Sequence, residues 1–459
     1  AVVTARRVEA DYLVVGAGAA GMAFVDALVG HADVRVVMVD RRDGPGGHWR
    51  AAYPFVRLHQ ASSFYGVAST VLGGGALQTD GPEAGLQVRA DQPTICAYYD
   101  GVLERLRGTG RVELFAGCEY LGDRTFAASG SGQRYEVPAG CRVVDARYLA
   151  PDIPAEEPPR FAVDGAQVVP VNDLPLRAGA ASQYVIVGSG KTATDACVWL
   201  LGRGVDADAL CWIRPRDPWM LNRAVVQPDP AVYLGMVADL MRRAAAATSL
   251  DEWFLGLEDA GTMLRIDRSV TPTMAKAPTL GTWELDLLRG IEHVVRLGHV
   301  VAARPGRIEL ADGAVTVAAD ALVVNCAADG LKNKPRRPIW GPEAITVQPV
   351  RAGFPCFGAA LVGYVEATRD DDARKNALCP PSSFGNTLAD WAAMNARGAR
   401  AVASFGAEPD IADWSNRVAI NPARVPPGHP GSAALDDALE QLRTWSAPGA
   451  ARLAELSGT

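Results

Sequence analysis

Three glycines and a distant aspartate form the first group of residues whose spacing suits a defined chemistry. Gly16, Gly18 and Gly21 follow a short apolar run, and Asp40 ends the next apolar run. Such glycines let the chain turn sharply, let the backbone approach a pyrophosphate and let the following helix pack closely, while the N–H groups at the helix start attract phosphate. An acid about twenty residues after the last glycine accepts hydrogen bonds from a ribose hydroxyl. The stretch predicts a strand, turn, helix and strand that bind a dinucleotide.

A second unit of the same kind begins near residue 183. Gly188 and Gly190 follow an apolar run, and Lys191 and Thr192 open an amphipathic helix. Gly-Lys-Thr also occurs in phosphate loops of ATP-binding proteins, but that motif requires a glycine where this chain has Val185. The pattern therefore favours a second dinucleotide site over an ATP site.

Two arginines follow the second strand of this unit, where the first unit has an acid. Arg214 and Arg216 stand at the position from which an acid would bind a ribose 2′-hydroxyl. Arginine there accommodates a 2′-phosphate, so the pair favours NADPH over NADH. The alternative is a pair of solvated surface cations.

Between Asp40 and residue 65 the sequence has no regular period, which predicts a long structured loop. It contains Gly46-Gly47-His48-Trp49 and, further on, Tyr53-Pro54, Arg57 and His59. The glycine pair allows close backbone approach to a ligand, and the aromatic residues supply flat apolar surface.

In this loop the sequence resembles the flavin-containing and Baeyer–Villiger monooxygenases, in which a Gly-Gly-x-Trp element follows the first nucleotide motif. Their Tyr-Pro-Gly-x-Arg-x-Asp stretch looks like the counterpart of the segment from Tyr53 to His59, with histidine in place of the aspartate. The resemblance implies FAD on the first unit, with Gly47, His48 and Trp49 as further contacts, and NADPH on the second. It places Arg57 and His59 beside the flavin as catalytic residues, although a histidine in such a loop also occurs as an ordinary hydrogen-bonded side chain.

The implied activity is that of an NADPH-dependent monooxygenase, in which a flavin hydroperoxide transfers oxygen to a small organic substrate. Residues 161–173 occupy the place of the family's Phe-x-Gly-x-x-x-His-x-x-x-Phe/Tyr string but lack its histidine and closing aromatic residue. A flavin-dependent oxidase or dehydrogenase that acts without oxygen transfer is therefore the alternative. A flavoprotein that binds or senses a ligand without turnover is a third possibility. The helical patterns over about residues 217–300 argue against it, because a large helical insertion suits the enclosure of a substrate.

These motifs predict an α/β fold with two Rossmann-like dinucleotide-binding domains and a helical insertion. We expect residues 1–150 to form the first part of the FAD domain, and residues 151–330 the NADP domain, interrupted by helices over about 217–300. Residues 331–459 would return to the FAD domain and end in a helical segment. A proline-rich stretch at residues 150–182 suits the crossover between the domains.

Two later segments bear on a substrate site. Met236, Met241 and the neighbouring aromatic residues of the insertion suit either a substrate cavity or, more commonly, helix packing. The apolar run Phe357–Val365 suggests a strand. The family resemblance returns the chain to the flavin near residue 386, so Asn386 and Thr387 are candidate substrate contacts. Capping of the next helix, 388–405, by Ser382 or Ser383 is the alternative.

Composition excludes several other classes. The chain has 459 residues, 49% of them hydrophobic, and a net charge of −7, which does not indicate a nucleic-acid or anionic-membrane partner. No apolar stretch approaches the length of a membrane helix, and, since residues 1–7 lead straight into the first strand, we expect no signal peptide. Eight cysteines without a CxxC pair and six dispersed histidines indicate neither a redox disulfide nor a metal site. We expect a cytoplasmic enzyme acting on a small molecule and oxygen; a homodimer is compatible with the sequence.

Overall fold

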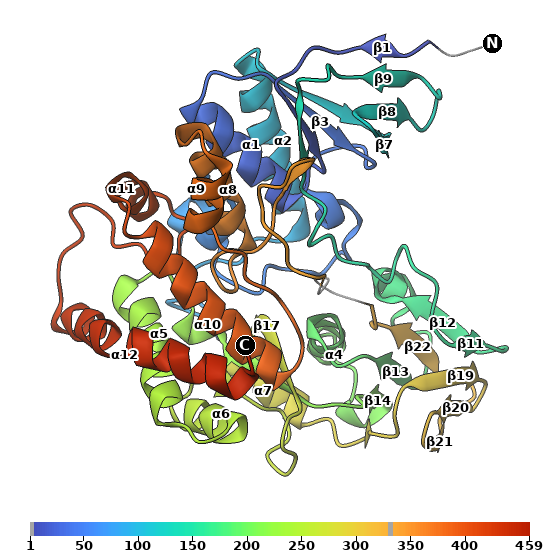
Figure 1. The fold of residues 1–459 in the computed structure, drawn as a ribbon. Coiled ribbons are helices and arrows are strands. Elements are labelled where there is room, and N and C mark those ends of the chain that lie inside the picture. Colours follow the sequence, from blue (N-terminus) through green and yellow to red (C-terminus); the bar gives the residue numbers. More distant parts are fainter. Residues whose placement is uncertain (1–3, 329–333) are drawn as a thin grey trace.

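Two parallel five-stranded sheets form the frame of the molecule (Figure 1). The structure is a computed structural model that describes residues 4–328 and 334–459, so the expected domain boundary at 330/331 lies outside the described residues. Both sheets have helices packed on them, which confirms the α/β class with two Rossmann-like units.

The first sheet contains the first glycine motif at its centre. From edge to edge it consists of β23 (Ala344–Thr346), β10 (Arg142–Asp145), β2 (Tyr12–Val15), β3 (Val36–Asp40) and β6 (Val112–Ala116), all parallel. Val14 and Met38 face a core shared with the helices α1 (Ala19–His31), α2 (Gln92–Gly108) and α8 (Pro355–Thr368). Leu13 and Val37 face the small sheet β1 (Arg6–Arg7), β9 (Arg134–Glu136), β8 (Thr125–Ala128) and β7 (Cys118–Gly122). Both faces are covered, as the uninterrupted apolar strands require.

The second sheet repeats this plan. It consists of β12 (Gln167–Pro170), β22 (Leu322–Asn325), β13 (Tyr184–Val187), β14 (Leu210–Ile213) and β18 (Val294–Val295), again all parallel. One face joins the core that contains α4 (Lys191–Gly202), while Val185 and Ile213 face a small sheet on the other side. That small sheet consists of β11 (Ala162–Val163), β19 (Val300–Arg304), β20 (Arg307–Leu310) and β21 (Gly313–Thr316). The short helix α3 (Leu174–Arg177) follows β12.

The segment between β14 and β18 leaves the second sheet and forms the predicted insertion. It contains the helices α5 (Pro230–Ala246), α6 (Leu250–Asp259) and α7 (Thr282–Arg289), together with a three-stranded sheet of β16 (Met263–Leu264), β15 (Pro218–Asn222) and β17 (Met274–Leu280). The sequence had suggested helices only.

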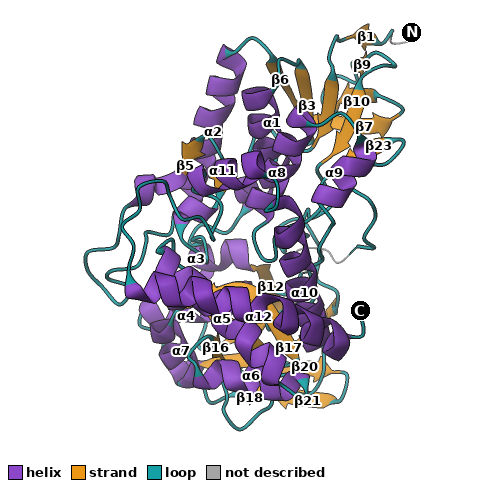
Figure 2. Ribbon diagram, turned by 60° about the vertical axis from the view of Figure 1, so that its left-hand side comes forward, coloured by secondary structure: helices purple, strands orange, loops and turns teal. Residues whose placement is uncertain are grey.

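The C-terminal part of the chain ends in four helices. They are α9 (Asp372–Leu378), α10 (Leu388–Phe405), α11 (Pro409–Arg417) and α12 (Ala433–Ser457). In both views α10 and α12 lie beside α5 of the insertion, and α12 packs along α5 for most of its length (Figures 1 and 2). No helix in the described residues is long and apolar enough to cross a membrane.

The expectation of a strand at Phe357–Val365 was wrong, because this segment belongs to α8. Nearly every residue of α8 is buried, between α1 and the rest of the core. A helix that is covered all round is apolar all round, so its sequence lacks the 3.6-residue period that separates a helix from a buried strand.

Candidate functional site

The first glycine loop joins β2 to α1 and is held in shape by its own backbone. Gly16 has a φ of +106°, a conformation that favours glycine. A Cβ atom on Gly21 would lie 1.9 Å from the carbonyl oxygen of Gly16, so only glycine lets α1 begin this close to the strand. The Ala17 N–H donates to Asp40 Oδ2 over 2.7 Å, which ties the loop to the end of β3. The glycines and the acid of the predicted motif thus form one cradle.

The Gly46-Gly47 loop closes over this cradle. The Gly46 N–H donates to the Ala17 carbonyl over 2.9 Å. A Cβ atom on Gly47 would lie 3.0 Å from the Cα atom of Gly18, so the two backbones are in contact. The wall at this point is bare backbone, which is what a pyrophosphate needs in order to approach N–H groups.

His48 and Trp49 follow in a short 3-10 helix over Gly47–Ala51. The Trp49 indole Nε1 donates to the Tyr65 hydroxyl over 2.7 Å, which fixes the ring as a buried wall. Burial, together with the nearby Arg42 cation, lowers the pKa of His48 to about 4. His48 is therefore neutral at neutral pH and suited to hydrogen bonding rather than to pairing with an anion.

The start of α4, which follows the second glycine loop, is bonded directly to the Tyr53–Arg57 segment. α4 begins at Lys191, whose ammonium group pairs with Asp195 and donates to the Arg57 carbonyl over 3.2 Å. The Tyr53 hydroxyl donates to Asp195 Oδ2 over 2.6 Å. These bonds hold the start of α4 against the Tyr53–Arg57 segment and so bring the two predicted nucleotide sites together.

A cleft of about 550 Å³ is lined by the first glycine loop and by the start of α4, whereas Gly188 and Gly190 of the second loop do not line it. Ten of the residues predicted for the site line it: Gly16, Gly18, Asp40, Gly47, His48, Trp49, Arg57, His59, Lys191 and Thr192. Gly21 lies behind the cleft and shapes it. Pockets that bind small molecules span roughly 300–1,000 Å³, so this volume suits parts of two nucleotides meeting at their reactive ends.

His59 is held as a neutral donor. Its Nδ1 accepts the Thr279 N–H over 3.0 Å, so the proton of the neutral ring is on Nε2. Burial, with the charges of Lys191 and Arg223 beside it, holds the pKa of His59 well below its ordinary value. Its backbone carbonyl accepts Arg223 Nε over 2.7 Å. His59 therefore offers a fixed N–H at its Nε2 atom.

The two arginines predicted to meet a 2′-phosphate have different surroundings. Arg214 is 1% exposed and its guanidinium donates to Asp217 over 3.3 Å, whereas Arg216 is exposed. The charge of Arg216 acts on Lys276 of β17, a residue that sequence analysis did not single out. Burial and that charge lower the pKa of Lys276 to about 8, and its Nζ donates to Asn386 Oδ1 over 3.0 Å. Arg216 is thus close enough to Lys276 for its charge to lower the pKa of Lys276, whereas Arg214 is turned inward.

Asn386 and Thr387 line neither the cleft nor the second cavity, which adjoins the cleft. Both residues are exposed. The Thr387 hydroxyl accepts the Asp390 N–H over 2.9 Å, and this bond caps the N-terminus of α10. The cap of this helix is therefore Thr387 rather than Ser382 or Ser383.

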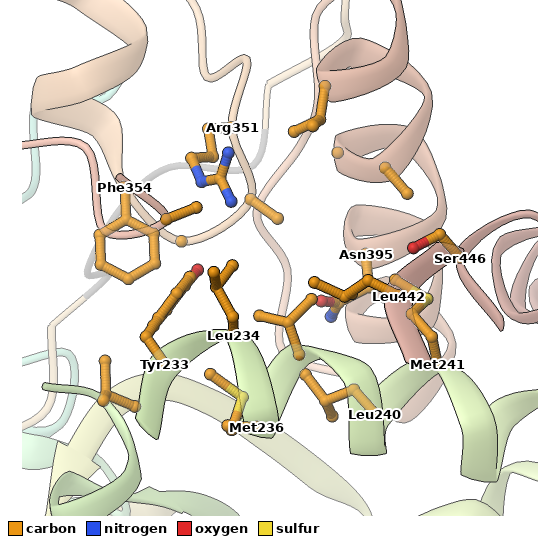
Figure 3. Close-up of a pocket in the computed structure, with 18 of the residues that line it drawn as sticks. Tyr233, Leu234, Met236, Leu240, Met241, Arg351, Phe354, Asn395, Leu442 and Ser446 are labelled. Carbon is orange, nitrogen blue, oxygen red and sulfur yellow. The ribbon is translucent and has the colours of Figure 1, made fainter. Parts of the chain in front are cut away.

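A second cavity of about 620 Å³ adjoins the cleft (Figure 3). The two share His59, Gln60, Ala277 and Gly353 as lining residues. Met236 and Met241 line this second cavity, whereas Trp219 and Phe254 of the same insertion are buried in the core. The buried Arg351 also faces it, and no local sequence pattern marks that residue.

Comparisons with known proteins agree with this geometry. Residues 14–57 match the family model of the NAD(P)-binding Rossmann-like domain. The chain is 42% identical over 422 residues to "Uncharacterized protein Rv2000" of Mycobacterium tuberculosis and to "Uncharacterized protein Mb2023" of Mycobacterium bovis, covering 91% of this chain and 78% of each relative.

Solved structures extend the likeness to the whole fold. A closed crystal structure of cyclohexanone monooxygenase matches with a TM-score of 0.50 at 15% identity, covering 97% of this chain and 98% of that one. The cyclohexanone monooxygenase from Rhodococcus sp. Phi1 bound to NADP⁺ matches with a TM-score of 0.50 at 14% identity over the same shares. At such identities the likeness shows a shared fold, which confirms the resemblance at that level. The chain belongs to the protein family of the mycobacterial relatives Rv2000 and Mb2023 and is built on the fold of the Baeyer–Villiger-type monooxygenases.

Proposed function

We propose that the protein is a flavin-dependent, NADPH-using monooxygenase that acts on a small organic substrate. One observation carries the proposal: the first glycine loop and the start of α4, at Lys191 and Thr192, line the same cleft, against a wall that contains Trp49 and His59. A single nucleotide site would not require the start of α4 to be bonded to the Tyr53–Arg57 segment through Lys191 and Asp195. The shared fold with cyclohexanone monooxygenase supports the same reaction class.

The residues of the cleft fit both cofactors. FAD would be held by the bare backbone of Gly16, Gly18 and Gly47, with Asp40 for its ribose. NADPH would be held at the second loop, and its 2′-phosphate would meet Arg216 and Lys276. We accordingly assign residues 1–150 and the C-terminal return to FAD, and residues 151–330 to NADPH.

When bound and reduced, the flavin supplies the activation of oxygen. In the overall reaction, substrate, O₂, NADPH and one proton give oxygenated substrate, NADP⁺ and water. The chain contributes the positions of the two cofactors, through the Tyr53–Asp195–Lys191 bonds, and a fixed hydrogen-bond donor, His59 Nε2–H. Arg57, which also lines the cleft, adds a positive charge where negative charge develops.

The decisive experiment is an anaerobic titration of the purified protein with NADPH and, separately, NADH, followed by oxygen. The proposal expects NADPH to bleach the flavin and an organic substrate to be recovered with one added oxygen atom. Bleaching without oxygenated product would favour the alternative, an oxidase or dehydrogenase. If neither nucleotide reduces the flavin, the proposal is wrong.

A matched pair of glycine variants tests the cofactor site. Gly21→Ala places a methyl group against the Gly16 carbonyl and should yield protein without flavin, whereas Gly30→Ala on the same helix has nothing within 4 Å of the new atom. Flavin content is read from the absorbance of the purified proteins. If both variants contain the same amount of flavin, the assignment of FAD to the first glycine loop is wrong.

A further inference from the structure

The second cavity is an apolar chamber formed where three helices meet. α5, α10 and α12 contribute most of its wall, which includes Leu234, Leu240, Met241, Met394 and Leu442 (Figure 3). Of these side chains, those from α10 and α12 come more than 150 residues after those from α5, and together they surround a space of about 620 Å³. A cavity of this size and character suits an apolar small molecule.

At the end near Phe354, a buried charged side chain interrupts the apolar wall; the other cation of the lining, Arg443, is exposed. Arg351 is 9% exposed and points into the cavity, beside the Tyr233 hydroxyl (Figure 3). Its Nε is buried without a hydrogen-bond partner. Within residues 4–328 and 334–459, no carboxylate lies within ion-pair distance of its guanidinium.

Such an arrangement is costly for a folded protein. The Tyr233 hydroxyl gives the Arg351 guanidinium a neutral hydrogen-bond partner. A neutral partner does not replace a counter-ion, and buried charges are normally paired. The same chain pairs its other deeply buried cations, as Arg223 with Glu83 and Lys375 with Glu366 show. The missing partner of Arg351 is therefore best explained as part of a ligand.

The position of Arg351 connects this ligand to the cleft. Gly353, two residues further along the chain, lines both spaces, as does His59. Arg351 itself lines the apolar cavity and is not part of the cleft wall. A molecule whose charged end pairs with Arg351 would extend its apolar part between α5, α10 and α12 while lying against the wall of the cofactor cleft.

We propose that this cavity binds an apolar substrate that carries a carboxylate group, with Arg351 as the partner of the carboxylate. The planar guanidinium offers two parallel N–H donors that match the two oxygens of a carboxylate. The inference rests on the proposed function, since it names the class of molecule that the monooxygenase takes.

Three probes of equal chain length test the proposal on the flavin-loaded protein: decanoate, 1-decanol and decyltrimethylammonium. Calorimetry or tryptophan fluorescence gives the affinities, the latter because Trp391 lines the cavity. We expect decanoate to bind at least tenfold more tightly than decanol, and the cation least. Hexanoate should bind more weakly than decanoate by about fourfold for each methylene removed. Equal affinities for decanoate and decanol would overturn the proposal.

Variants assign the selectivity to one residue. Arg351→Met should abolish the preference for decanoate and keep the affinity for decanol, and Arg351→Lys should retain part of the preference. Arg443→Met, which removes an exposed cation from the lining of the same cavity, is the control and should change the preference less than twofold. If Arg351→Met releases the flavin while the preference persists, Arg351 serves the cofactor and the proposal is wrong.

These results separate the proposal from the proposed function. Selective decanoate binding without oxygenated product would retain the carboxylate site and reject the monooxygenase. NADPH-dependent oxygenation of an uncharged molecule, with no selectivity for decanoate, would retain the monooxygenase and reject the carboxylate site. Should Arg351→Met fail to fold, the three ligands and Arg351→Lys still decide the question.

Discussion

Two buried arginines, both close to the segment that carries His59, have opposite surroundings. Arg223 is 1% exposed and pairs with Glu83 and Glu284, and its Nε donates to the His59 carbonyl over 2.7 Å. Arg351 is 9% exposed, and within the described chain it has no carboxylate partner. The charge of Arg223 is neutralised by carboxylates of the protein, whereas the charge of Arg351 is not neutralised within the described chain.

The charges around Arg223 show how complete the first arrangement is. Burial raises the pKa of Glu83, but Arg223 and Arg89 outweigh burial and bring that pKa to about 2. The Trp283 indole also donates to Glu83, over 2.9 Å. Removing one member of a buried ion cluster of this kind is strongly destabilising, because each member left behind is an uncompensated charge. The comparison shows that a buried cation indicates a ligand site mainly when the protein itself provides no carboxylate to pair with it.

The largest effect should follow from breaking the closed cluster. Arg223→Met leaves Glu83 and Glu284 buried side by side, and we expect a loss of about 3–5 kcal/mol in the free energy of unfolding. Urea denaturation measures it. The control is Arg107→Met, whose pair with Glu104 has side chains 44% and 71% exposed, and which should cost less than about 1 kcal/mol. A similar small loss for both variants would mean that Arg223 is not structural.

The same substitution at Arg351 should have the opposite sign. Arg351→Met removes an unpaired buried charge and fills its place with an apolar side chain of similar length, so we expect stability to rise by about 2 kcal/mol. Thermal unfolding without added ligand measures the change. A clear fall in stability would show that Arg351 holds its own loop in place, and the contrast with Arg223 would disappear.

Sequence analysis found the parts of the site that depend on neighbouring residues. The glycine loops were predictable because Gly16, Gly21 and Asp40 act within one strand–helix–strand unit. Helix α10 was predicted with its observed bounds, Leu388–Phe405, because its apolar period is local, although its cap is Thr387 and not the predicted Ser382 or Ser383.

What sequence analysis missed depends on distant residues. The apolar cavity exists only because α12 folds back along α5. No local sequence pattern indicates that Arg351 is buried without a carboxylate partner. Likewise, Arg214 and Arg216 look equivalent in the sequence, and only Asp217 and the packing around it decide which of them turns inward. The number and type of charges could be read from the chain, but their partners could not.

Lys276 extends the comparison to the cofactor site, since it too is a largely enclosed cation without an acidic partner in the described chain. Burial and the charge of Arg216 lower its pKa from 10.5 to about 8. The protonated form is the one that pairs with a 2′-phosphate, so the affinity for NADPH should fall roughly tenfold between pH 7 and 9, while that for NADH stays constant. Affinities of the two nucleotides, measured across this range, provide the test.

A substitution identifies the titrating group. Lys276→Met should bind NADPH more weakly at pH 7 and should lose the pH dependence of the NADPH preference. Stability without nucleotide should change in the opposite direction: between pH 8 and 10.5 the folded protein has lost a proton that the unfolded chain retains, so unfolding becomes harder as pH rises. A pH dependence that persists in Lys276→Met would assign it to another group.

The smallest effect concerns Thr387, which the sequence placed at the substrate and the structure places at the start of α10. Thr387→Ala removes a capping bond and should lower the free energy of unfolding by about 1 kcal/mol. Thr444→Ala, on the exposed side of α12, removes no cap and is the control. Because α10 forms one wall of the cavity but Thr387 lies outside it, decanoate affinity should be the same in both variants. A selective loss of decanoate binding in Thr387→Ala would place the substrate at the helix start and move it away from Arg351.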